Sequence, residues 1–370
     1  MTPQAPADQP GIRCTLMRGG TSKGPFFLES DLPGNPALRD ALLVSIMGSG
    51  DPLQIDGIGG AHPLAAKAAV VSRSRRAGAD LDYLFLQLGV EHATVTDRQN
   101  CGNMLAAVGP FAVERGLIEA GQEQTTTTIH MVNSGALVTA TFPTPGGLPR
   151  YAGDTAIAGV PGTAAPVMLR FAGTAGSATG SLLPTGSVSD VIDGVEVSCV
   201  DNGMPVVVAR AADLGVTGYE PAAELAANGE LGRKVAALRL AAGRAMGLGD
   251  VGRLTVPKVT LVSAPRAGGA ICTRTFIPVR VHTAIGVLGA VTVATALLLP
   301  GGVGSELARL PSAGHILEVE HPSGKLAVEV DLDAAADPPR VRTAGVVRTA
   351  RKLFDGIVYP SAYPSALVAG

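Results

Sequence analysis

A glycine-rich segment near the start of the chain carries two cationic and two hydroxyl side chains. Residues 18–24 read RGGTSKG. Glycines let backbone amides approach a ligand closely, and guanidinium, ammonium and hydroxyl groups donate hydrogen bonds to carboxylates. The segment is not a P-loop, because its lysine precedes a glycine and a strand-like PFFL instead of opening a helix. It predicts a carboxylate-binding turn, with an ordinary hairpin turn as the alternative. Its candidate ligands are Arg18, Thr21, Ser22 and Lys23.

A second candidate is the thiol of Cys101, in the polar sequence QNCGN at the expected start of an apolar helix. The positive end of a helix dipole stabilises a thiolate, and the free amides there bind carboxylate or enolate oxygens. A small buried core residue is the alternative. Pro110 falls inside the same helix, where we expect a kink or an early end. The binding candidates around the thiol are Asn100, Gly102 and Asn103.

Lys67 is the third candidate, because it interrupts the apolar sequence PLAAKAAVV. A lysine in a buried strand is costly unless it is paired or used. Desolvation favours the neutral amine, which is the form that a general base needs. The alternative is a lysine on an edge strand whose ammonium reaches solvent.

The second half of the chain offers a looser set of candidates. Arg274 has the planar fork that binds a carboxylate through two hydrogen bonds. His282 is expected at the start of a buried helix, from which it could donate to another carboxylate. Lys258 adds a cation, and Met204 follows a glycine in a turn that resembles the first one. The set predicts additional binding groups for an anionic substrate.

Composition excludes several classes of function. The chain has 370 residues, of which 46% are hydrophobic and 16% charged, with a net charge of −2. This balance supports a large core and argues against disorder. It provides no excess of positive charge for binding nucleic acid. None of the four cysteines forms a CxxC pair, so metal clusters and redox motifs are not expected and no cofactor is required.

Two segments of the sequence indicate the cellular compartment of the protein. The charge-free run 283–299 is shorter than a typical membrane span and lacks interfacial anchors, so we expect a helix buried within a domain and no membrane association. The first ten residues are polar and proline-rich, and they have no apolar stretch of the kind found in a signal peptide. They predict a loose tail, and a cytoplasmic protein.

The same plan occurs twice along the chain. CTLMRGG, TSKG and PFFL correspond to VEVSCV, DNGM and PVVV; the stretches around Lys67 and Lys258 correspond next, followed by two apolar helices. This order predicts an internal duplication in an α+β fold, in which each half wraps a mostly antiparallel, barrel-like sheet around a central apolar helix. We expect domains at 11–188 and 189–342, with 343–370 forming a C-terminal strand that returns to the first domain.

These motifs together resemble the PrpF-type isomerases of the diaminopimelate epimerase-like fold. The resemblance rests on MRGGTSKG, DGIGGAHPLAAK, QNCGNMLAAVGPFAVERGL, RYAGDT, DNGMPVV, DLGVTGYEP, VPK and HPSGK, and it runs from about Cys14 to Val358. It implies a site between two halves, Lys67 as the acid/base residue and Cys101 beside the substrate. Racemases of the wider fold use two thiols, whereas this chain has HTAIG, starting at His282, where the second would stand. The resemblance also implies a role in aromatic-acid catabolism and a homodimer.

The expected reaction is a cofactor-free allylic proton shift or keto–enol conversion of a small tricarboxylate that bears a ketone and a double bond. Lys67 would move the proton, and hydroxyls and amides would hold the dienolate. An isomerase for an aconitate-type substrate is the nearest alternative. A one-base amino-acid epimerase or dehydratase would need an acidic cluster for an ammonium group, which the sequence does not offer. A non-catalytic carboxylate-binding protein is the remaining alternative.

Overall fold

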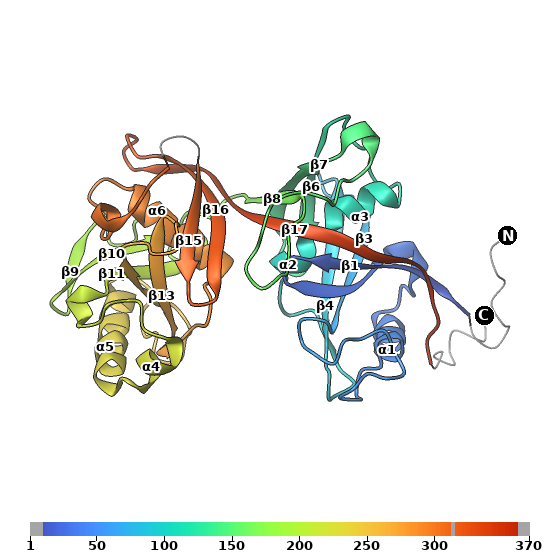
Figure 1. The fold of residues 1–370 in the computed structure, drawn as a ribbon, viewed down its shortest axis with the longest axis horizontal. Coiled ribbons are helices and arrows are strands. Elements are labelled where there is room, and N and C mark those ends of the chain that lie inside the picture. The colour runs from blue at the N-terminus through green and yellow to red at the C-terminus, as the bar shows by residue number, and fades with distance from the viewer. Residues whose placement is uncertain (1–9, 312–314, 362–370) are drawn as a thin grey trace. The chain divides into compact units, whose positions relative to one another are not determined.

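The structure, a computed structural model, describes residues 10–311 and 315–361 and divides the chain into two compact units (Figure 1). Unit 1 comprises Met1–Leu169 with Arg348–Gly370, and unit 2 comprises Arg170–Val347. The sequence suggested a junction at 188/189. The segment before that point belongs to unit 2 because it bonds to Asp201, whose carboxylate accepts from the amides of Ala178 and Thr179. The expected N-terminal tail lies outside the described residues except for Pro10.

In unit 1 the described strands form one sheet in the order β8–β17–β1–β2–β3–β4–β6–β7, with β5 added to β4. The pairs β17–β1, β1–β2, β3–β4, β4–β5 and β6–β7 are antiparallel, and β2–β3 and β4–β6 are parallel. The strands are β1 (Ile12–Gly19), β2 (Ser22–Leu28), β3 (Lys67–Arg73), β4 (Leu81–Leu88), β5 (Val95–Thr96), β6 (Gln124–Met131), β7 (Ala136–Pro143), β8 (Pro166–Phe171) and β17 (Arg340–Val358).

Helices cover both faces of this sheet. The helix α1 (Pro36–Met47), capped by the Asn35 side chain, packs its Leu42, Leu43 and Ile46 on the outer face. The helices α2 (Gly102–Leu105) and α3 (Val108–Glu114) fill the inner face and contact β1, β2, β3 and β7. The break between them confirms the expected interruption, since Pro110 has no N–H to donate to the carbonyl of Ala106. Two 3-10 helices, η1 (Glu29–Asp31) and η2 (Pro145–Gly147), complete the unit's helices.

Unit 2 repeats this sheet. Its described strands are ordered β9–β10–β11–β12–β13–β15–β16–β17, with β14 added to β13, and only β11–β12 and β13–β15 are parallel. The strands are β9 (Asp190–Ile192), β10 (Val195–Asp201), β11 (Pro205–Arg210), β12 (Lys258–Ser263), β13 (Ile271–Ile277), β14 (Arg280–Val281), β15 (Ile316–His321) and β16 (Gly324–Asp333), together with the first part of β17.

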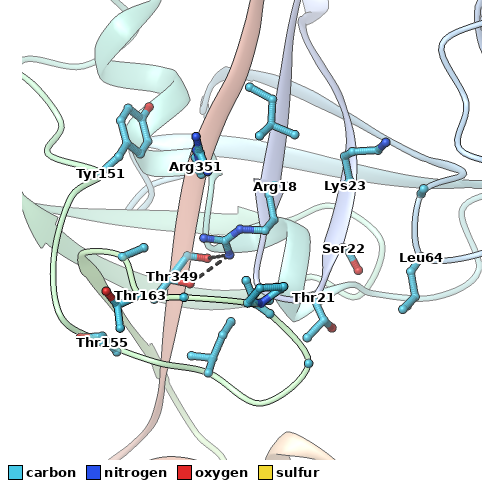
Figure 2. Close-up of a pocket in the computed structure, with 18 of the residues that line it drawn as sticks. Arg18, Thr21, Ser22, Lys23, Leu64, Tyr151, Thr155, Thr163, Thr349 and Arg351 are labelled. Carbon is cyan, nitrogen blue, oxygen red and sulfur yellow. Dashed lines mark hydrogen bonds between the residues drawn. The ribbon is translucent and has the colours of Figure 1, made fainter.

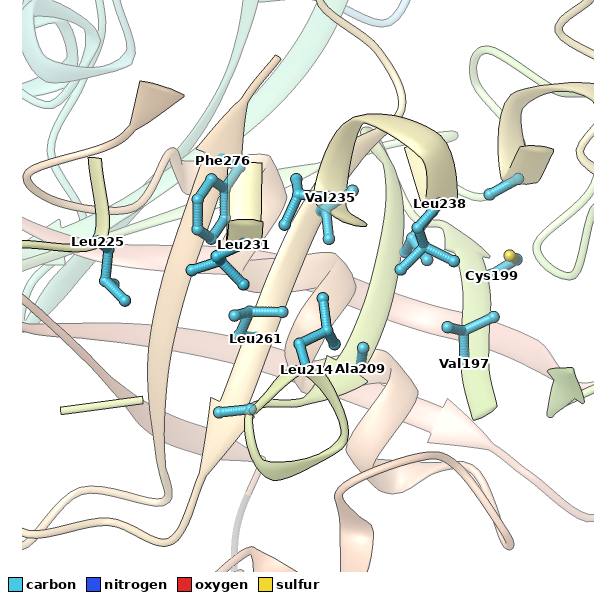
Figure 3. Close-up of a cluster of buried hydrophobic side chains, with 14 of the residues drawn as sticks. Val197, Cys199, Ala209, Leu214, Leu225, Leu231, Val235, Leu238, Leu261 and Phe276 are labelled. Carbon is cyan, nitrogen blue, oxygen red and sulfur yellow. The ribbon is translucent and has the colours of Figure 1, made fainter. Parts of the chain in front are cut away.

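The outer face of the unit 2 sheet packs against α4 (Ala222–Ala227) and α5 (Gly229–Ala245). Figure 3 shows Leu231, Val235 and Leu238 of α5 gathered with strand residues such as Leu261 and Phe276 in one cluster. Burying several aliphatic side chains of this size, at about 1.5–3 kcal/mol each, is enough to hold a helix on a sheet. The 3-10 helices of the unit are η3 (Ala212–Leu214) and η4 (Ser305–Leu307).

The charge-free run forms α6 (Val287–Leu298), which contacts β10, β11, β15 and β16 on the inner face. All but three of its twelve residues are buried, which confirms the expected core helix. No helix in the described parts of the chain is both long and apolar enough to cross a bilayer.

The two units share one pattern of strand pairing. Antiparallel β1–β2, β3–β4 and β6–β7 match β10–β11, β12–β13 and β15–β16, and the parallel pairs β2–β3 and β4–β6 match β11–β12 and β13–β15. Each unit is therefore a mostly antiparallel, barrel-like sheet around a central apolar helix. The predicted fold class is confirmed.

Candidate active site

Lys67, Cys101 and Ser22 meet inside unit 1. The Lys67 Nζ atom lies 3.8 Å from the Cys101 Sγ atom, which lies 3.9 Å from the Ser22 Oγ atom. The three residues are nearly inaccessible, with relative exposures of 9%, 8% and 1%. An amino group, a thiol and a hydroxyl, of which the thiol contacts the other two, are groups that can take part in proton transfer. The structure thus brings together three of the residues that the sequence singled out.

The side chain of Lys67 points to the inner face of the sheet, because successive side chains of β3 alternate between the two faces. Its neighbours Ala68 and Val70 pack on the outer face with α1, so Lys67 and Ala69 face the central helices. The Lys67 Nζ atom lies 5.3 Å from the centre of the Phe85 ring, within the range of a cation–π contact. No carboxylate within the described chain forms a salt bridge with Lys67. The interpretation of Lys67 as an edge residue that reaches solvent does not fit this placement.

Cys101 is the N-cap residue of α2, as the sequence predicted for a helix start. The Tyr83 hydroxyl donates to the Cys101 carbonyl at 3.3 Å, and burial raises the pKa of Tyr83 well above its ordinary value, so this donor stays protonated. Because α2 has only four residues, its dipole contributes less at the thiol than the sequence suggested. The contacts with Lys67 and Ser22 are the stronger feature.

The turn between β1 and β2 is tied to the start of α2. The Asn103 Nδ2 atom donates to the Thr21 Oγ1 atom at 3.0 Å. Gly20 has φ +50, and a Cβ there would lie 2.2 Å from Asn103 Oδ1, so only glycine allows this approach. Gly102 has no atom within 4 Å of its Cβ position, and Asn100 is exposed. This contact positions Ser22 against Cys101.

Arg18 and Lys23 lie on the other face of the hairpin, where they line a cavity of about 700 Å³. The Arg18 Nη1 atom donates to the Thr349 carbonyl and hydroxyl (Figure 2). It also donates to the Gly20 carbonyl. Neither Lys67 nor Cys101 lines this cavity, whereas Thr21 and Ser22 do. Arg18 and Lys23 thus lie in a cavity that adjoins the cluster of Lys67, Cys101 and Ser22, with Ser22 belonging to both.

In unit 2, Lys258 occupies the position that Lys67 has in unit 1. It is the first residue of β12, the strand that matches β3, and it faces away from α5. Burial lowers the pKa of Lys258, and burial together with the charge of Lys258 lowers the pKa of His282. The Ala284 amide donates to the His282 Nδ1 atom. His282 stands five residues before α6, because that helix begins at Val287 and not at the histidine.

Arg274 and Met204 were both expected to bind the substrate, but the structure shows other contacts for them. In the register of β12 and β13, Arg274 faces Leu261, so its side chain lies on the outer face, opposite to Lys258. It donates to the carbonyls of Glu220 and Thr273. The Met204 carbonyl accepts from the Thr292 hydroxyl and anchors the turn to α6. The structure does not bring Arg274 together with the other candidates.

The described residues contain no cluster of three or more His, Cys, Asp or Glu side chains arranged to hold a metal ion.

A model of one protein family, described as PrpF protein, matches residues 9–361. The chain belongs to the PrpF family.

Several PrpF-family relatives have names that state an activity. The (4E)-oxalomesaconate Delta-isomerase of Novosphingobium sp. (strain KA1) is 55% identical over 94% of this chain and 96% of its own length. The 4-oxalomesaconate tautomerase of Pseudomonas putida is 52% identical over 95% of this chain and 96% of its own. A crystal structure of methylitaconate-delta-isomerase matches with a TM-score of 0.87 and 32% identity over 98% of both chains.

Four residues of this PrpF-family chain were missed by the sequence analysis. Tyr83 supports the Cys101 backbone, and Tyr151, Thr349 and Arg351 line the cavity beside Arg18. RYAGDT could have indicated Tyr151, since that motif contains an arginine, a tyrosine and a turn. Nothing in the sequence indicates that Arg351 lies opposite Arg18, because this follows from the pairing of the first and last strands.

Proposed function

We propose that the protein is an isomerase that moves a proton along 4-oxalomesaconate, an unsaturated tricarboxylate bearing a ketone. The contacts of Cys101 with Lys67 and with Ser22 carry this proposal, because they put a base, a thiol and a hydroxyl close together inside the barrel. Two PrpF-family relatives with 55% and 52% identity are named for this substrate, which supports the choice of reaction and substrate.

The chemistry assigned to Lys67 is a single-base shuttle. The carbon acid next to the conjugated keto group loses its proton to the neutral amine of Lys67, and the electron pair delocalises onto the ketone oxygen as a dienolate. The Lys67 ammonium then returns the proton at a different carbon, which moves the double bond and leaves the amine neutral again. Atoms and charge balance without a further reactant. General-base catalysis of this kind supplies about 100- to 10,000-fold in rate.

Cys101 and Ser22 have a supporting role in this proposal. Their side chains touch each other and the thiol touches Lys67, so they orient the amine and donate to the developing oxyanion. The amides that follow Cys101 at the start of α2 are further donors. We also assign Lys258, His282 and Met204 to substrate binding. We assign no binding role to Arg274, since its side chain lies on the outer face of the sheet, opposite to Lys258.

We further propose that the reaction needs no cofactor, takes place in the cytoplasm during the breakdown of aromatic acids such as gallate and protocatechuate, and is carried out by a homodimer. These assignments follow the resemblance of the sequence to its family. Size-exclusion chromatography with light scattering tests the homodimer, and dialysis against a chelator followed by an assay tests the absence of a metal requirement.

The test of the substrate is proton NMR of 4-oxalomesaconate with the purified protein. Protein-dependent migration of the double bond is the expected result. An aconitate-type acid is the second candidate, favoured by a 3-methylitaconate isomerase of Eubacterium barkeri at 33% identity and a 2-methyl-aconitate isomerase of Shewanella oneidensis at 32%. Turnover of 2-methylaconitate with none of 4-oxalomesaconate would reverse the order of the two. A protein that binds both acids and converts neither would be a carboxylate-binding protein.

A further inference from the structure

Three cations stand in a row on the outer face of the unit 1 sheet. Arg18 of β1 is the direct cross-strand partner of Lys23 on β2 and of Arg351 on β17. Directly opposite residues share a face of the sheet, and adjacent strands are about 4.8 Å apart, so the row spans roughly 10 Å. Like charges at directly opposite positions destabilise a sheet. Two such pairs in succession lower the stability of the sheet, and the fold alone does not explain why they are present.

No carboxylate neutralises this row. In the described parts of the chain, none of the three cations forms a salt bridge, and the residues that line the adjoining cavity include no Asp or Glu. Glu114, which accepts from the Tyr151 hydroxyl at the cavity wall, is already paired with Lys352. Burial and the charge of Arg351 both lower the pKa of Arg18, which is the expected effect of an uncompensated neighbour.

The cavity has the size and lining of a site for a small polyanion. Its volume of about 700 Å³ falls within the usual range for ligand pockets. Figure 2 shows Arg351 beside Tyr151 at one side of the cavity, Lys23 on the side of Leu64, and Arg18 between them. Hydroxyl groups complete the donor set; they belong to Thr21, Ser22, Tyr151, Thr155, Thr163 and Thr349.

We propose that the row Lys23–Arg18–Arg351 and its cavity form a second anion site in unit 1, which binds a small di- or tricarboxylate beside the Lys67–Cys101 cluster, with Ser22 in the wall between the two. Cations at both sides of the cavity favour a ligand with separated anionic groups over a single phosphate. Since Lys67, Cys101 and Asn103 do not line the cavity, its ligand does not touch the proposed base. The site is therefore a binding site and not the place of proton transfer, and it does not depend on the proposed function.

The test is calorimetric titration with tricarballylate, a saturated tricarboxylate that cannot isomerise, in a Lys67→Met background. Two binding events are expected there, since the other residues assigned to substrate binding are intact, and Arg351→Gln should weaken only one of them, at least about tenfold, as the loss of a charge-assisted contact requires. Arg351→Glu should abolish it, because the new carboxylate would pair with Arg18. The matched control is Arg342→Gln on the same strand, whose arginine is already paired with Asp331 and Asp333 and should have no effect.

A thermal measurement gives an independent readout. Tricarballylate should raise the Tm of the wild-type protein more than that of Arg351→Gln, and ligand-free Arg351→Gln should be at least as stable as wild type because a like-charge pair is removed. A single binding event in the Lys67→Met background, or two events that are both unchanged by Arg351→Gln, would overturn the proposal. So would inorganic phosphate binding as tightly as tricarballylate, since a single anion cannot reach both sides of the cavity.

Discussion

Lys67 and Lys258 occupy matching strand positions in the two units but differ in their surroundings. Lys67 contacts a thiol and lies near an aromatic ring, whereas Lys258 acts on a histidine whose pKa it helps to lower. The sequence predicted both lysines from the repeated pattern. It could not predict that Arg274 faces outward, because β13 is buried on both faces and its alternation carries no polarity signal.

The coupling of Lys258 to His282 can be measured directly. Burial and the Lys258 charge both lower the pKa of His282 below 6.5, so Lys258→Met should raise that pKa while leaving it below the ordinary value. NMR titration of the His282 ring in both proteins measures the shift. An unchanged titration would mean that Lys258 does not act on the histidine.

The same coupling has a consequence for acid stability. A histidine whose pKa is lower in the folded protein than in the unfolded chain binds fewer protons when folded, so stability falls as the pH drops from about 6.5 towards the folded pKa. Lys258→Met should make this loss smaller. Urea unfolding of both proteins at pH 8 and pH 5 is the measurement, and an equal loss in both would contradict the expectation.

At the scale of elements, the close packing of neighbouring strands and helices determines where the site residues lie. The sequence predicted the strand–turn–strand of β1 and β2, and Pro110 predicted the interruption of the central helix. The parallel contact of β2 with β3 was not predicted, because no local signal encodes pairing across a helical crossover.

Gly24 is the residue on which the β2–β3 contact depends. A Cβ at Gly24 would lie 2.0 Å from the carbonyl oxygen of Lys67. Gly24→Ala should therefore displace the start of β3, cost about 1–3 kcal/mol of stability, and lower kcat by moving Lys67 away from Cys101. The control is Gly232→Ala in α5, where no atom lies within 4 Å of the Cβ position and a gain of about 0.5–1 kcal/mol is expected. Urea denaturation measures the stability of both variants, and a turnover assay measures their activity. A Gly24→Ala protein with full stability and full activity would contradict the expectation.

At the scale of the whole molecule, the duplicated architecture was visible in the sequence because three matching stretches occur in the same order in both halves. The crossing of the chain from unit 2 back to unit 1 within one long strand was anticipated only as a C-terminal return. It begins at Arg348, five residues after the expected 343, since β17 pairs with β16 up to Val346 and with β1 from Ala350. Long-range pairing of this kind leaves no periodic signal along the chain.

Truncation after Val347 tests the role of that return. It removes the β17 residues that pair with β1 from Ile12 to Gly19, and with them the Thr349 acceptors of Arg18. Hydrogen-exchange mass spectrometry should show loss of protection throughout the unit 1 strands and retained protection in α6 and β10–β13, which serve as the internal control. Full protection of β1 in the truncated protein would show that the return is dispensable.

The central claim is that Lys67 alone moves the proton, and its most direct test is proton NMR of 4-oxalomesaconate in D₂O with Lys67→Met and Lys258→Met. The second variant is the matched control, because its lysine opens the corresponding strand of the other unit. Lys67→Met should lose about 100- to 10,000-fold in double-bond migration and in deuterium incorporation, with the fold intact. Lys258→Met should keep its rate at saturating substrate and show a raised KM. Equal loss in both variants, or undiminished exchange in Lys67→Met, would contradict the single-base account.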